Sequence, residues 1–140
     1  MIGNGDLIHL KNTVFPVIKL VNIAKAAMQQ AYAPYSKFHV GAAIITLDGR
    51  TYSGCNIENA SYGLTCCAER VAIFKAVSDG IKYFKALAVI ADTQHYCTPC
   101  GACRQIIMEF NPEMEIYTAN KNGEYKKHIA KELLPYTFRL

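Results

Sequence analysis

Two short cysteine-containing strings, far apart along the chain, constrain this fold most strongly. The first is Thr-Cys-Cys-Ala-Glu-Arg at residues 65–70, and the second is Pro-Cys-Gly-Ala-Cys-Arg-Gln at residues 99–105. Cysteine thiolates are zinc ligands, and a Cys-x-x-Cys pair with a distant third cysteine supplies three of them. A fold that uses them in this way must bring both strings to one point.

Both strings fall at expected helix N-termini. The pattern predicts helices over Ala68–Ser78 and over Cys100–Phe110, and Pro99 suits a helix start. Zinc with three thiolates carries a net negative charge, which the positive end of a helix offsets in part. We expect Arg70 or Arg104 to donate to a ligand sulfur and to offset more of this charge.

Three protein ligands with an open fourth position are typical of a catalytic zinc site, because water or substrate occupies the vacancy. Glu69 follows Cys67 by two residues, so a carboxylate is expected beside the metal. In isolation, a glutamate in a first helical turn often serves only to complement the helix dipole. The adjacent cysteine favours a catalytic role for Glu69.

The cysteines leave alternatives open. Cys66 and Cys67 compete for the third ligand position, and the spacing to Glu69 favours Cys67. Cys97 also forms a Cys-x-x-Cys pair with Cys100, and a closed site of four cysteines would be structural. A redox dithiol is a further reading, although it leaves Cys67 and Glu69 without a role. Cys55 and Cys97 are otherwise expected to be buried structural thiols.

The rest of the pattern alternates helices with strands. Residues 1–12 are expected to be a loose lead-in, and a helix is expected over residues 13–30, with Thr13 as its cap. The remaining elements are strands over 40–46 and 51–56 joined by Asp48-Gly49, strands over 84–91 and 115–119, and a short helix over 128–134. This order predicts one domain over residues 1–140, with an α/β sheet covered on both faces.

The composition and charge of the chain limit the classes of partner that it is expected to bind. The 140-residue chain has a net charge of +4, with its Lys and Arg residues scattered. Scattered basic residues do not form the clustered positive patch that binds a phosphate backbone, so we expect no nucleic-acid partner. Because no secretory signal or membrane span is visible, we expect no membrane association and a cytoplasmic location. Six cysteines then indicate metal ligands and free thiols.

Beyond the cysteine strings, further segments resemble the small, homotetrameric class of cytidine deaminases. These segments are Phe-His-Val-Gly-Ala-Ala at 38–43, Asn-Ile-Glu-Asn-Ala-Ser-Tyr at 56–62 and Glu-Leu-Leu-Pro at 132–135. The resemblance covers roughly residues 35–138, in the order of that family. The cysteine strings alone indicate the wider deaminase superfamily, and the Asn-x-Glu-Asn segment points to a free nucleoside.

The resemblance implies a three-layer α/β/α sandwich around a mixed five-stranded sheet. It also implies one Zn²⁺ per chain, with Cys67, Cys100 and Cys103 as ligands, and Glu69 as the proton shuttle. In that family, residues at the positions of Asn56 and Glu58 hydrogen-bond the 3′-hydroxyl of the ribose. The residue at the position of Phe38 packs against the pyrimidine.

Members of this family also share active sites between subunits. The resemblance implies that Ala60 and Tyr62 lie near the sugar in a partner's site, and that Phe138 stacks on the partner's base. The expected reaction is the zinc-dependent hydrolytic deamination of cytidine and deoxycytidine, with release of ammonia, in pyrimidine salvage. The alternatives are a polynucleotide deaminase, a deaminase of a cytosine-containing antibiotic nucleoside, and a non-catalytic zinc protein.

Overall fold

The centre of the computed structural model, which describes residues 5–140, is a sheet in the strand order β4-β3-β5-β6-β7. The strands are β3 (Val40–Thr46), β4 (Thr51–Cys55), β5 (Phe84–Ala91), β6 (Glu115–Ala119) and β7 (Tyr125–Ile129). Strands β5 and β6 run parallel, and the other neighbours are antiparallel. The expected mixed five-stranded sheet is confirmed.

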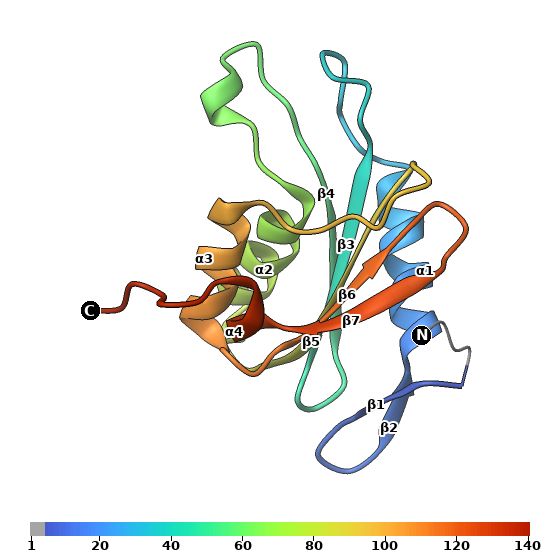
Figure 1. Ribbon diagram of the computed structural model, residues 1–140, viewed down its shortest axis with the longest axis vertical. Helices are drawn as coiled ribbons and strands as arrows, with labels where there is room; N and C mark the ends of the chain where they lie inside the picture. Colours follow the sequence, from blue (N-terminus) through green and yellow to red (C-terminus); the bar gives the residue numbers. More distant parts are fainter. Residues whose placement is uncertain (1–4) are drawn as a thin grey trace.

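Helices cover both faces of this sheet (Figure 1). They are α1 (Val17–Met28), α2 (Ala68–Ser78), α3 (Gly101–Phe110) and α4 (Ala130–Leu133), with a 3₁₀ turn, η1, over Tyr62–Leu64. Helix α1 lies on one face, and α2, α3 and α4 lie on the other (Figure 1). The three-layer α/β/α arrangement is therefore as expected.

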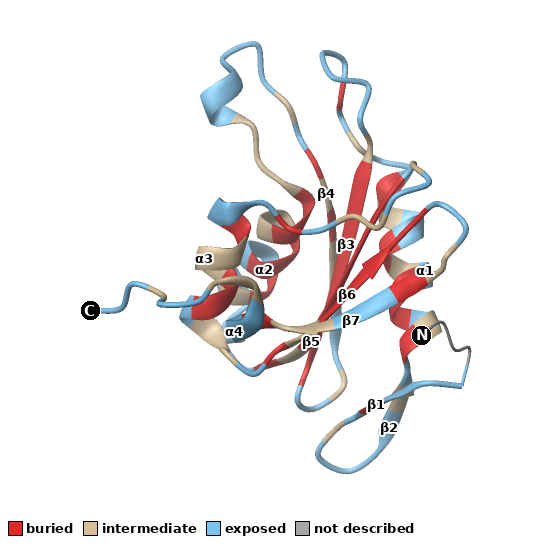
Figure 2. Ribbon diagram, in the orientation of Figure 1, coloured by how far each residue is buried: buried red, intermediate tan, exposed pale blue. Residues whose placement is uncertain are grey.

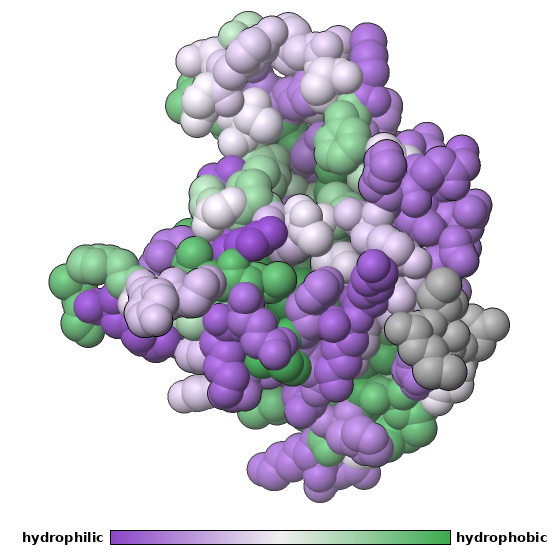
Figure 3. Space-filling model, viewed as in Figure 1, coloured by the Kyte–Doolittle hydropathy of each residue, from purple (hydrophilic) through white to green (hydrophobic). Residues whose placement is uncertain are grey.

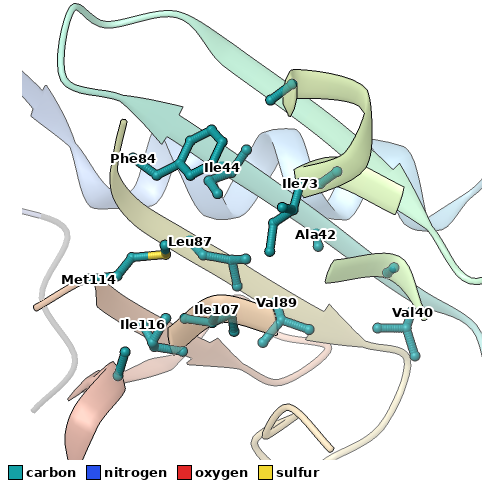
Figure 4. Close-up of a cluster of buried hydrophobic side chains, with 14 of the residues drawn as sticks. Val40, Ala42, Ile44, Ile73, Phe84, Leu87, Val89, Ile107, Met114 and Ile116 are labelled. Carbon is teal, nitrogen blue, oxygen red and sulfur yellow. The ribbon is translucent and has the colours of Figure 1, made fainter. Parts of the chain in front are cut away.

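Each face of the sheet has its own core. On one side, the buried stripe of α1 packs against alternate residues of β3 and β5, among them Ala43 and Ile90. On the other side, Ile73 of α2 and Ile107 of α3 meet Leu87 of β5 (Figure 4). The central strands are buried on both faces (Figure 2), which explains their unbroken apolar sequences.

Helix α2 approaches the sheet closely because β4 carries a glycine. A Cβ atom at Gly54 would lie 2.6 Å from the backbone nitrogen of Ala72 and 2.7 Å from the carbonyl oxygen of Ala68. Real Cβ atoms do not approach backbone this closely, so any larger residue would push α2 away. Gly54 therefore fixes the position of the first turn of α2.

The N-terminal expectation was wrong in part. Residues 5–12 are not loose, because β1 (Leu7–His9) pairs with β2 (Val14–Pro16) in an antiparallel hairpin. Ile8 is fully buried, and the hydroxyl of Tyr125 donates to Asp6 at 2.7 Å. These distant contacts stabilise a hairpin that its short strands alone do not predict. The expected loose segment at residues 1–4 lies outside the described residues.

The same hairpin corrects the start of α1. The helix begins at Val17 and not near Thr13, and Pro16 occupies the N-cap position with an extended backbone. Proline suits a helix entrance because its fixed φ is compatible and the first helical N–H groups have no intrahelical partner. The backbone N–H of Val17 donates instead to the carbonyl of Asp6 at 3.0 Å.

The predicted bounds of the C-terminal helix, residues 128–134, were also wrong. Residues 128 and 129 belong to β7, and only Ala130–Leu133 form a helix. Strand β7 is an edge strand whose Lys126 and Lys127 are exposed. Hydrophilic side chains cover much of β7 in Figure 3. Lysines on an edge strand discourage pairing with another chain, and they also weaken the sequence signal for a strand.

Among the described residues, no helix has the length and apolar character needed to cross a membrane.

Candidate metal centre and substrate cleft

A cleft of about 260 Å³ lies at the end of the sheet where β4 and β5 finish. Its walls come from the segment before β3, the segment after β4, and the approaches to α2 and α3. In open α/β sheets, ligands commonly bind beyond the carboxyl ends of strands. The cleft brings together both cysteine strings and the Asn-x-Glu segment.

The two cysteine strings converge as expected. One ligand atom from each of Cys67, Cys100 and Cys103 lies within 4.8 Å of the others, and the Sγ atoms of Cys67 and Cys100 are 3.9 Å apart. Two thiolates bound to one tetrahedral zinc lie about 3.8 Å apart, given a Zn–S distance of about 2.3 Å. The three thiols therefore fit one zinc ion.

The competing cysteines do not join this group. Among residues 5–140, the cluster of potential ligands contains neither Cys66 nor Cys97. Cys97 does line the cleft, and burial raises the pKa of its thiol to about 12. The geometry thus favours the three-thiol set over a closed four-cysteine site.

Local helix geometry explains why the sulfurs meet. Cys67 is the N-cap of α2, and Cys100 is the N-cap of α3. The backbone N–H of Cys103 donates to the sulfur of Cys100 at 3.5 Å. Unpaired N–H groups at a helix start favour negative charge, so both caps suit thiolates.

Arg70 supplies the expected positive charge beside the sulfurs. Its Nη2 donates to the Sγ of Cys67 at 3.3 Å. The neighbouring Cys103 thiol and the Arg70 guanidinium lower the pKa of Cys67 to about 5, although burial opposes this change. The Nε of Arg70 is buried and has no hydrogen-bond partner among the described residues. A thiolate is therefore favoured at Cys67 even before a metal binds.

Arg104, the expected alternative to Arg70 as a donor to a ligand sulfur, makes other contacts. Its Nε donates to the carbonyl of Pro99 at 2.7 Å, and its Nη1 donates to the carbonyl of Leu133 at 2.9 Å. The guanidinium therefore ties the loop before Cys100 to the end of α4. Backbone carbonyls compete well for a guanidinium because they are fixed acceptors within its reach.

Glu69 lies in the first turn of α2 and lines the same cleft as Cys67 and Cys100. Its side chain is enclosed, since the residue is only 4% exposed. Burial raises the pKa of Glu69 to about 7, because desolvation penalises the charged carboxylate. A carboxyl group with this pKa can both accept and release a proton near neutral pH.

Three further expected residues line the cleft: Phe38, Asn56 and Glu58. The Asn56 amide accepts a hydrogen bond from the N–H of Val40 at 2.9 Å and donates to the carbonyl of Phe38 at 2.7 Å. Asn56 therefore also holds the entrance to β3 in place. Phe38 is 45% exposed, so its ring is available to a ligand.

Ala60, Tyr62 and Phe138 are not among the residues that line this cleft, within the described part of the chain. Tyr62 lies in an adjoining hollow that shares Ser36, Glu58 and Thr65 with the cleft. Phe138 is 70% exposed, and its carbonyl accepts a hydrogen bond from Gln105 of α3 at 3.2 Å. These side chains are thus exposed and do not pack in the hydrophobic core of their own chain.

The cleft also contains residues that the sequence did not single out. They are Ser36, Val40, Thr65 and Thr98. Ser36 is the most notable, because its hydroxyl donates to Glu58, which is 22 positions away. A single serine in a polar turn carries no sequence signal for a contact at that distance.

Comparisons with known proteins agree with this arrangement. Residues 17–119 match the family described as the cytidine and deoxycytidylate deaminase zinc-binding region. A cytidine deaminase of Sporosarcina psychrophila is 55% identical over 123 residues, which cover 87% of this chain and 90% of that protein. One from Halalkalibacterium halodurans is 49% identical over 120 residues, which cover 85% and 91%.

A crystal structure of cytidine deaminase from Burkholderia pseudomallei has a similar fold. Its TM-score against this structure is 0.86, with 46% sequence identity. The alignment covers 89% of this chain and 100% of the other. The N-terminal hairpin lies before the stretch that matches the family, since that stretch begins at the first residue of α1.

Proposed function

The chain belongs to the cytidine and deoxycytidylate deaminase family. From that premise, we propose that it removes the amino group of cytidine and deoxycytidine by hydrolysis. The products are uridine or deoxyuridine and ammonia. One observation carries the proposal: the enclosed Glu69 carboxyl shares a cleft with Cys67 and Cys100 of the three-thiol cluster and with Asn56 and Glu58.

We propose that Cys67, Cys100 and Cys103 hold the zinc ion. When bound, zinc supplies a Lewis acid that activates water at neutral pH. Arg70 stabilises the thiolate of Cys67 through its hydrogen bond, and Arg104 fixes the loop that carries Cys100. Support comes from the 3.9 Å between the Sγ atoms of Cys67 and Cys100, which is close to the separation expected around one tetrahedral zinc ion, and from the closeness of all three ligand atoms, which lie within 4.8 Å of one another.

Glu69 is the proposed proton shuttle. It accepts one proton from the attacking water and delivers it to the ring nitrogen next to the amino-bearing carbon, which makes that carbon more electrophilic. Glu69 then carries the proton of the new hydroxyl group to the amino group, and the carbon–nitrogen bond breaks to release ammonia. The pKa of about 7 suits both roles.

The sugar and base contacts are proposed for Asn56, Glu58 and Phe38. An amide and a carboxylate together can hold a hydroxyl group that both donates and accepts, which suits the 3′-hydroxyl. Phe38 offers an exposed ring at the mouth of the cleft for contact with the pyrimidine. The small cleft and the scattered basic residues support a free nucleoside as substrate, with no nucleic-acid partner.

We further propose a homotetramer with active sites shared between subunits. Exposed apolar side chains near the cleft support this assembly, since Tyr62 is 74% and Leu64 is 71% exposed. Ala60, Tyr62 and Phe138 are the residues proposed to reach a partner's site. Closed, symmetric assemblies are the common form of soluble homo-oligomers.

The remaining proposals concern organisation and location. Residues 1–140 are proposed to work as one cytidine deaminase domain, because both hydrophobic cores draw on the same sheet. A cytoplasmic location without membrane association is proposed from the many free thiols in the chain.

The direct test is ultraviolet absorbance of the zinc-loaded protein with cytidine, deoxycytidine and free cytosine. We expect both nucleosides to lose absorbance with matching ammonia release, while cytosine remains unchanged because it offers no ribose to Asn56 and Glu58. Reaction with none of the three, in a protein that carries stoichiometric zinc, would contradict the proposed function.

A further inference from the structure

The segment between α1 and β3 is held in an uncommon conformation beside the cleft. Lys37 has a φ of 60°, in the left-handed region that residues other than glycine seldom adopt. Its N–H donates to the carbonyl of Ala33 at 3.1 Å, which closes a tight turn. Such a conformation persists only where neighbouring contacts determine it. The contacts made by Ser36 and Glu58 meet this requirement.

Within residues 5–140, the hydrogen bonds to the Glu58 carboxylate come from this turn. Its Oε1 accepts from the backbone N–H groups of Tyr35 at 3.0 Å and Ser36 at 3.1 Å. Its Oε2 accepts from the Ser36 hydroxyl. A carboxylate held by both oxygens cannot rotate freely, so its remaining lone pairs have fixed directions.

The Ser36 hydroxyl occupies a central place between the two proposed substrate contacts. It donates to Glu58 and accepts from the backbone N–H of Phe38 at 3.0 Å. A hydroxyl has one proton, so donation to Glu58 commits it. The same bond is the largest cause of a lowered pKa at Glu58, which keeps that carboxylate ionised and able to accept a hydrogen bond.

We propose that Ser36 is a positioning residue for selection of the sugar. Its hydroxyl fixes the Glu58 carboxylate and the Phe38 backbone, so that Glu58 favours nucleosides that carry a 3′-hydroxyl group. This inference rests on the proposed contact between Glu58 and the sugar. Ser36 acts through Glu58, lines the cleft and lies outside the cluster of three thiols.

The test compares kcat/KM for deoxycytidine with kcat/KM for 2′,3′-dideoxycytidine, which lacks only the 3′-hydroxyl. The wild-type protein is expected to favour deoxycytidine by at least about tenfold, because a lost hydrogen bond to a charged group typically costs about 10- to 100-fold. Ser36→Ala should lower that ratio severalfold, with the dideoxy substrate little affected. Ser36→Thr keeps the hydroxyl and should restore the ratio.

Matched variants separate the possible outcomes. Ser36→Cys retains the volume with a weaker donor and should lower the ratio as Ser36→Ala does, even if the alanine variant folds poorly. Ser78→Ala removes an exposed hydroxyl at the end of α2 and should leave the ratio unchanged. Glu58→Gln should lower the ratio at least as far as Ser36→Ala.

Three results would overturn the inference in different ways. If wild type turns over deoxycytidine without preferring it to the dideoxy analogue, the proposed sugar contact of Glu58 fails, and the inference fails with it. If wild type and Ser36→Ala show the same preference while Glu58→Gln loses it, the sugar contact stands and the role of Ser36 is wrong. An equal loss on both substrates would indicate a merely structural serine.

Discussion

Glu69→Gln is expected to lower kcat for cytidine by about 10²- to 10⁴-fold, which is the usual contribution of a positioned acid–base group. The glutamine side chain keeps the size of Glu69 but cannot take a proton from water or return it. The three thiols and Arg70 are unchanged, so zinc should remain bound at one ion per chain. Steady-state kinetics and metal analysis of the same preparation measure both quantities.

A surface carboxylate provides the control for Glu69→Gln. Glu113 follows the far end of α3 and its exposed side chain pairs with Lys131, so Glu113→Gln should keep the wild-type rate. Near wild-type turnover in Glu69→Gln with zinc intact would mean that another group shuttles the proton. Loss of zinc from the variant would instead assign Glu69 a role in metal binding.

Cys67→Ser and Cys66→Ser are expected to differ sharply although they change neighbouring residues. Cys67 supplies one sulfur of the cluster and accepts the hydrogen bond from Arg70, whereas Cys66 lies outside the cluster. We expect Cys67→Ser to weaken zinc binding by more than the roughly 10- to 100-fold typical of removing an outer-shell partner. Activity should fall with zinc content.

Cys66→Ser and Cys97→Ser serve as the matched controls, measured by competition with a zinc chelator and by the nucleoside assay. Cys66 and Cys97 both lie outside the cluster of three thiols among the described residues. Both controls should retain stoichiometric zinc. Zinc loss from Cys66→Ser with retention in Cys67→Ser would shift the ligand by one residue and contradict the assignment.

Much of the fold follows from local patterns in the sequence. The expected bounds of β3, α2, β5 and β6 agree with the structure. A glycine-containing turn signal follows β3, α2 and β6, and β5 is a nearly continuous apolar run. Gly80, for example, adopts a φ of 88° just after α2, as a helix-terminating glycine does. The cysteine strings also predicted their own meeting point, since zinc chemistry demands it.

Other parts depend on contacts between distant residues, which periodicity does not encode. The N-terminal hairpin is stabilised by Ile8 and by the bond from Tyr125 to Asp6, and neither contact appears as a local pattern. Strand β7 was missed because its exposed lysines hide the strand alternation. Likewise, the bond of Arg104 to Leu133 is visible only once α4 is folded against α3.

The site was predictable in its chemistry and less so in its supporting contacts. Motif and resemblance identified Phe38, Asn56, Glu58 and Glu69 in the cleft, together with the clustered thiols. They did not identify the serine turn that holds Glu58, because a hydrogen-bonding role for one loop serine depends on three-dimensional placement. The residues of a site are therefore easier to find than those that hold them in position.

X-ray absorption at the zinc edge of the purified protein tests the proposed metal centre most directly. Three sulfur neighbours at about 2.3 Å and one oxygen or nitrogen at about 2.0–2.2 Å are expected, because three thiols leave a position for water or substrate. Four sulfur neighbours would show a closed, structural site that includes a fourth cysteine, and would contradict a catalytic zinc beside Glu69.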